Sequence, residues 1–98
     1  MPVFADPEDT ETGALHDYAD FRGKRVLEVG CGDGRLTWRY AERAASVVAI
    51  DPQAEDIAIA LADCPAALRH KIAFRVTRLE ELDIPEEKFD LALLSWSL

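Results

Sequence analysis

The chain has 98 residues, of which 49% are apolar and 31% are charged, and its formal net charge is −8. That length and apolar fraction predict a single globular domain and exclude wholesale disorder, and no apolar run approaches the roughly 20 residues needed to cross a bilayer. The acidic balance disfavours nucleic acid and membranes as partners and favours a small or neutral molecule.

The N-terminal segment differs in composition from the rest of the chain. Residues 1–13 combine proline with several acidic side chains and show no sustained apolar period. This composition predicts a flexible acidic arm outside the folded domain. The domain is expected to occupy residues 14–98, beginning with a short helix over 14–21 that ends at Gly23.

The chain has two cysteines, which could in principle form a disulfide bond. Cys31 and Cys64 do not form a C-x-x-C pair, and with two histidines in the chain no metal cluster is predicted. No basic segment followed by an apolar stretch stands at the N-terminus, so a secretory signal is not visible. We therefore expect reduced thiols in a cytoplasmic protein.

Short apolar runs alternate with helical patterns along the chain. Apolar runs rich in branched residues predict buried strands, and the stretches between them predict helices. The strands are expected at 25–29, 46–50, 72–76 and 89–95, and the helices at 36–45 and 53–63. This alternation predicts an α/β fold with parallel crossovers and a sheet covered on both faces.

A glycine-rich turn follows the first of these strands. Gly30, Gly32 and Gly34 lie between a buried strand and a helix, where backbone without Cβ atoms allows a ligand to approach closely. Asp51 ends the next strand, where a carboxylate can accept hydrogen bonds from a ribose diol. The two features predict a nucleoside-binding crevice. Alternatively, the turn is purely structural and Asp51, which precedes Pro52, caps the following helix.

The spacing of the glycines discriminates between nucleoside-binding families. A dinucleotide fingerprint requires a third glycine where this chain has Arg35. The pattern E-x-G-x-G-x-G beginning at Glu28 resembles motif I of the class I S-adenosylmethionine-dependent methyltransferases. Residues 48–51 and 89–91 are similar to the family's second and fourth strands, and the resemblance covers about 21–98.

The resemblance implies a particular architecture. The fold class is α/β: a Rossmann-like, three-layer α/β/α arrangement with a mostly parallel sheet in the order 3-2-1-4. The domain is expected to be incomplete at its C-terminus and truncated after the fourth strand. That strand would then be an apolar edge, containing Leu91, Leu93 and Leu94, and would pair with a second copy in a dimer or larger homo-oligomer, or with a partner chain.

The resemblance also implies which residues bind the cofactor. Gly30 and Gly32 would pass close to its methionyl part, Glu28 would position the turn and the amino group, and Asp51 would bind the ribose. The full set expected to bind S-adenosylmethionine, with S-adenosylhomocysteine as product, is Glu28, Gly30, Cys31, Gly32, Gly34, Asp51, Pro52, Leu79, Glu80 and Ser95.

One position departs from the family pattern on the adenine side of the site. Pro52 or Gln53 would lie beside the adenine, and the family commonly has an acidic residue where this chain has Arg78. A guanidinium only donates hydrogen bonds, so it cannot accept one from the adenine amino group. Backbone groups near Leu79, or the side chain of Glu80, are the alternatives.

The implied activity is transfer of a methyl group from S-adenosylmethionine to a small-molecule acceptor, which the sequence does not identify. Its catalytic residues are not assigned. One alternative is a catalytically silent cofactor-binding or assembly module that requires a partner to complete the fold. A more distant alternative is a nucleotide-dependent oxidoreductase, which Arg35 disfavours.

Overall fold

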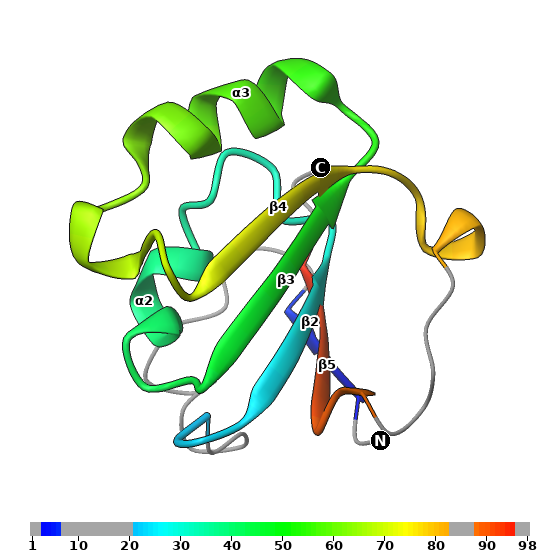
Figure 1. Cartoon of the computed structure of the whole chain (residues 1–98). Coiled ribbons are helices and arrows are strands. Elements are labelled where there is room, and N and C mark those ends of the chain that lie inside the picture. Colours follow the sequence, from blue (N-terminus) through cyan, green and yellow to red (C-terminus); the bar gives the residue numbers. More distant parts are fainter. Residues whose placement is uncertain (1–2, 7–20, 83–87, 96–98) are drawn as a thin grey trace.

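A computed structural model describes residues 3–6, 21–82 and 88–95 of the chain. Its centre is a single five-stranded sheet in which all neighbouring strands are parallel, in the order β1-β5-β2-β3-β4 (Figure 1). The strands are β1 (Val3–Asp6), β2 (Arg25–Val29), β3 (Ser46–Asp51), β4 (Ile72–Val76) and β5 (Leu91–Ser95).

The four strands predicted from the sequence are β2, β3, β4 and β5. Their spatial order β4-β3-β2-β5 confirms the expected 3-2-1-4 arrangement. The bounds of β2 and β4 agree with the prediction, β3 extends one residue further to Asp51, and β5 begins at Leu91 rather than at residue 89. The runs of β2, β3 and β5 are apolar on both faces, as expected of parallel strands with a neighbour on each side. Strand β4 lies at an edge of the sheet and was predicted from the alternation of Ile72, Phe74 and Val76 with smaller or polar residues.

The N-terminal strand β1 overturns two predictions. Residues 3–6 were expected to belong to a flexible arm, but they pair with β5, with Val3 opposite Ala92 and Asp6 opposite Ser95. Strand β5 is therefore not an edge, because β1 and β2 lie on its two sides. The exposed apolar edge through which a homo-oligomer or partner chain was expected is thus absent at β5. The rest of the arm and residues 14–20 of the predicted helix lie outside the described residues.

Two helices, α2 (Thr37–Ala41) and α3 (Ala54–Asp63), connect the central strands. Two short 3-10 turns, η1 (Ala66–Leu68) and η2 (Leu79–Glu81), flank β4. Helix α3 agrees with the predicted helix, and Pro65 follows its end. Helix α2 ends four residues earlier than predicted, at Ala41, and the chain continues with i→i+3 hydrogen bonds from Arg43 N to Tyr40 O and from Ala44 N to Ala41 O. The Lys71 ammonium caps this last turn by binding the carbonyls of Glu42 and Ala44 at 2.7 and 2.8 Å.

The core lies mainly on one face of the sheet. Side chains that alternate along the strands pack with both helices into one large cluster that includes Val26, Val47 and Leu93. A smaller cluster on the opposite face contains Leu27, Ile50 and Phe89. Both described helices therefore cover the same face (Figure 1), and in the described ranges no helix covers the other. The second helical layer of the expected fold stays a prediction.

Candidate active site

The loops that follow the parallel strands meet at one edge of the sheet. Because the strands point the same way, their carboxyl ends lie together (Figure 1). This edge brings together the glycine turn after β2, Asp51 at the end of β3, Thr77 after β4 and Ser95 at the end of β5. The residues predicted to bind the cofactor thus come from three adjacent strand ends and one neighbouring loop.

The glycine turn folds back over the end of β3. The N–H groups of Gly30 and Cys31 both donate to the Ile50 carbonyl, at 2.8 and 3.1 Å. Gly30 and Gly32 have φ angles of 80° and 57°, a region that side chains with a Cβ rarely adopt. This backbone path favours glycine at both positions, so the turn has no Cβ at Gly30 or Gly32.

Gly34, the third glycine of the pattern, has a packing role. Its φ is 91°, and a Cβ added there would lie 2.5 Å from the Trp38 indole ring. The indole in turn makes an edge-on contact with Phe74, with ring centroids 5.7 Å apart. The absent side chain therefore lets α2 and its Trp38 approach the turn closely.

Asp51 connects the loops that follow β2, β3 and β4. It is 8% exposed, and its Oδ2 accepts a hydrogen bond from Gly32 N at 3.0 Å. Its Oδ1 accepts from Gln53 N at 2.8 Å, and its backbone carbonyl accepts from Thr77 N at 3.1 Å. The alternative that Asp51 is the helix cap is wrong, because the N-cap residue of α3 is Gln53.

Glu28 lies beneath the glycine turn and is fully buried. Its Oε1 accepts hydrogen bonds from Thr37 Oγ1 at 2.7 Å and from Tyr40 Oη at 2.6 Å. Burial first, and then the Glu28 charge and hydrogen bond, raise the pKa of Tyr40 well above its ordinary value. The phenol therefore stays protonated and keeps donating to Glu28. These bonds fasten α2 to β2 directly below the turn.

Thr37 and Tyr40 were not anticipated from the sequence. A signal for them exists: an acid within a buried strand requires hydrogen-bond donors. Two hydroxyl residues three positions apart, on the helix that follows the strand, can reach one acceptor together.

Cys31 is buried within the turn. Desolvation raises the pKa of its thiol strongly, and the charges of Glu28 and Asp51 raise it further. A protonated thiol is a poor nucleophile and a poor metal ligand. Among the described residues, no three His, Cys, Asp or Glu side chains gather where they could hold a metal ion.

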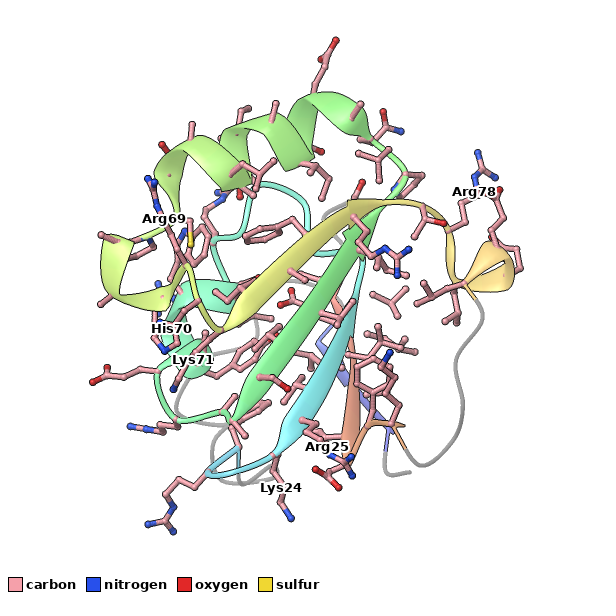
Figure 2. The ribbon with its side chains drawn as sticks, viewed as in Figure 1. Lys24, Arg25, Arg69, His70, Lys71 and Arg78 are labelled. Carbon is pink, nitrogen blue, oxygen red and sulfur yellow. The ribbon has the colours of Figure 1, made fainter. Side chains whose placement is uncertain are left out.

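The residues expected near the adenine are largely exposed. Pro52, Gln53 and Glu80 are exposed, and Leu79, the first residue of η2, is 42% exposed. Arg78 lies beyond the end of β4 with its guanidinium directed away from the sheet (Figure 2). The hydrogen bond between Thr77 N and Asp51 O brings this loop next to the end of β3.

Charge is distributed unevenly between the two ends of the sheet. Lys24 and Lys71 stand immediately before β2 and β4, at the amino ends of the strands (Figure 2). The loops and helix starts at the carboxyl ends carry more acidic than basic residues: Asp33, Asp51, Glu55, Asp56, Glu80 and Glu81 against Arg35 and Arg78. The field of this edge favours a cationic or neutral ligand over an anionic one.

Comparison with known proteins identifies the family. A family described as a methyltransferase domain matches residues 26–98, which include the glycine turn, Asp51 and the loop after β4. The chain belongs to this methyltransferase domain family. The resemblance expected from the glycine pattern is thereby confirmed.

Curated relatives of this methyltransferase domain carry a common name. A ubiquinone biosynthesis O-methyltransferase from Bradyrhizobium is 39% identical over 71 residues, which are 72% of this chain and 27% of the relative. The mitochondrial ubiquinone biosynthesis O-methyltransferase of Mus musculus is 40% identical over 97% of this chain and 26% of the relative. The chain thus spans about a quarter of the length of these relatives.

A solved structure has the same fold as this methyltransferase domain. An S-adenosylmethionine-dependent methyltransferase from Mesorhizobium loti superposes with a TM-score of 0.71 at 29% identity, over 87% of this chain and 38% of that protein. The Rossmann-like fold expected from the sequence is confirmed. No described helix of the chain is long and apolar enough to span a membrane.

Proposed function

We propose that this domain binds S-adenosylmethionine at the carboxyl edge of its sheet and supports methyl transfer to a hydroxyl oxygen of a small molecule. The carrying observation is that the glycine turn and Asp51 lie at adjacent strand ends, joined by the Gly32–Asp51 hydrogen bond. Family membership supports the cofactor and the reaction class. The names of the relatives support a ubiquinone precursor as the acceptor type.

The residues at this edge fit the cofactor. A carboxylate has roughly four lone-pair positions, of which Asp51 uses two for backbone N–H groups, so two stay available for a ribose diol. The turn at Gly30 and Gly32 offers backbone without side chains for close approach. The acidic edge suits the positive charge of a sulfonium group.

The roles of the predicted residues follow from their positions. We assign Gly30, Cys31 and Gly32 to backbone contact with the methionyl part and Asp51 to the ribose. Pro52, Leu79 and Glu80 are assigned to the adenine side, and Ser95 to the side of β5 that faces the acceptor. Glu28 and Gly34 act from below by fixing the turn, through the bonds to α2 and the packing of Trp38.

The bound cofactor supplies an activated methyl group, and the protein supplies orientation. Asp51 and the glycine turn hold the nucleoside and methionyl ends at fixed positions on one rigid sheet edge. Residues at the end of β5 lie next to the turn, because Val29 and Leu94 are register partners. An acceptor hydroxyl approaching along this side would meet the methyl group.

Isothermal titration with S-adenosylmethionine, S-adenosylhomocysteine and NAD tests the proposal. We expect the two sulfur ligands to bind and NAD not to bind. Binding of neither sulfur ligand rejects the proposal, and binding of NAD alone favours an oxidoreductase. A panel of phenolic and catecholic acceptors then tests turnover. Binding without turnover across that panel favours the catalytically silent module.

A matched pair of variants locates the site. Asp51→Ala is expected to lower the affinity for S-adenosylhomocysteine by at least about tenfold, since it removes a charged hydrogen-bond acceptor that would contact the ligand. Glu55→Ala removes a charge from an exposed position at the start of α3 and should change the affinity little. Equal affinities in the two variants would exclude Asp51 from the site.

A further inference from the structure

Asp51 receives a hydrogen bond from each of the three loops that the structure describes at the binding edge, those after β2, β3 and β4. Gly32 in the loop after β2 and Gln53 in the loop after β3 donate to its two carboxylate oxygens. Thr77 in the loop after β4 donates to its backbone carbonyl. The loops that would enclose the cofactor are thus joined through a single residue in the ligand-free chain.

We propose that Asp51 is a positioning residue for the glycine turn, in addition to any contact it makes with a ribose. This inference rests on the proposed function and deepens it. The carboxylate fixes Gly32 N–H relative to the start of α3 before a ligand arrives. The binding edge is therefore preorganised by the same side chain that would hold the ribose.

Burial strengthens the hydrogen bond between Gly32 N–H and the Asp51 carboxylate. Asp51 and Gly32 are both buried, so the Gly32 N–H has little access to water as a replacement acceptor. Hydrogen bonds to a charged acceptor are stronger than neutral ones, and an N–H left unsatisfied in a buried site carries the full desolvation penalty. Loss of the carboxylate would therefore remove the hydrogen bond that fixes the glycine turn, in addition to a contact with the ligand.

Asparagine cannot replace the carboxylate in this role. Both oxygens of Asp51 face a backbone N–H, at 3.0 and 2.8 Å. In either orientation, an amide at this position places its NH2 group against one of those two donors. Asp51→Asn therefore keeps the size of the side chain while breaking the link between the two loops.

The experiment separates positioning from ribose binding by changing the ligand. Dissociation constants are measured by titration for S-adenosylhomocysteine and for its analogue without the 2′ and 3′ hydroxyl groups. The proteins are the wild type, Asp51→Asn and the control Glu55→Gln, which makes the same carboxylate-to-amide change on an exposed side chain.

If Asp51 positions the turn, Asp51→Asn lowers the affinity even for the analogue without hydroxyls by at least about tenfold. The affinity of the control Glu55→Gln stays within about twofold of that of the wild type. Equal affinity of the wild type and Asp51→Asn for that analogue would overturn the proposal, because Asp51 would then act through the ribose alone.

Amide hydrogen exchange at Gly32 in the ligand-free wild type provides a second test that depends on no variant. The bonded N–H should exchange at least about a hundredfold more slowly than an unstructured glycine. Exchange at the unstructured rate overturns the proposal. If no ligand binds the wild type while Gly32 is protected, the proposed function fails but the positioning role is supported.

Discussion

Replacement of Gly34 by alanine separates backbone strain from packing in the glycine turn. Gly34 has a φ of 91°, and its added Cβ would lie 2.5 Å from Trp38. A left-handed backbone costs a residue with a Cβ about 1–2 kcal/mol, and overpacking of a well-filled site costs about 1–3 kcal/mol. Gly34→Ala should therefore lower the free energy of unfolding by about 2–5 kcal/mol.

Gly23 provides the matched control. Its φ of 69° is also positive, but a Cβ added there meets nothing within 4 Å. Gly23→Ala should therefore lower the free energy of unfolding only by the backbone contribution, about 1–2 kcal/mol. Urea unfolding followed by circular dichroism measures both losses, and the difference between them is the contribution of the Trp38 contact.

A third variant tests the assignment to Trp38. In a Trp38→Leu background the smaller side chain relieves the overlap, so the loss caused by Gly34→Ala should fall toward that of Gly23→Ala. Equal losses for Gly34→Ala and Gly23→Ala in the wild-type background would refute the packing argument. The third glycine would then be assigned to the backbone conformation alone.

Three further predictions concern single interactions. Tyr40→Phe keeps the ring but removes the bond to Glu28, and should lower the free energy of urea unfolding by about 1.5–3 kcal/mol; a loss below about 0.5 kcal/mol would count against that bond. Hydrogen bonds from Arg25 hold the pKa of Asp90 well below its ordinary value of 3.8, so this pair should stabilise the fold above that pH and its contribution should fade on acidification. Unfolding followed from neutral pH to about pH 2 should show a weaker acid dependence in Asp90→Asn, and identical profiles would remove the pair as a cause. Lys71→Met removes the ammonium that caps the turn after α2 by binding the carbonyls of Glu42 and Ala44. It should fray that turn, reduce the helical circular dichroism signal and lower stability by about 1 kcal/mol, and an unchanged spectrum and midpoint would contradict this role.

Local patterns predicted the elements whose causes are local. Strand β2 is a branched apolar run that ends at glycine, and α3 runs from just after Pro52 to just before Pro65. Both signals lie within or beside the element itself. The end of α2 was predicted four residues too far along the chain, because the groups that bind the backbone beyond Ala41, the Lys71 ammonium and the Lys24 carbonyl, lie far away in sequence.

Strand β1 shows the same limit more strongly. Its four residues have no period that distinguishes a strand from a loop, and its partner β5 lies near the other end of the chain. A pairing between such distant segments depends on the finished sheet. The sequence therefore could not reveal that the apolar fourth strand is covered on both sides.

The sequence predicted the main residues of the candidate site but not the hydrogen bonds that connect them. The glycine spacing and the acid after the second strand were readable, since each follows directly from a strand end. The Gly32–Asp51 bond and the convergence of Thr37 and Tyr40 on Glu28 depend on how the elements pack. Helix faces and loop paths must be known before such partners can be named.

The placement of β1 has a consequence for the order of folding. Strands β2, β3 and β4 are joined by short crossovers, so their pairing closes small loops at a low entropic cost. Strand β5 can pair with β2 only after a longer loop closes, and β1 needs β5 already in place as its template. We expect the chain to assemble from its middle outward, with its first strand the last to join and the first to leave.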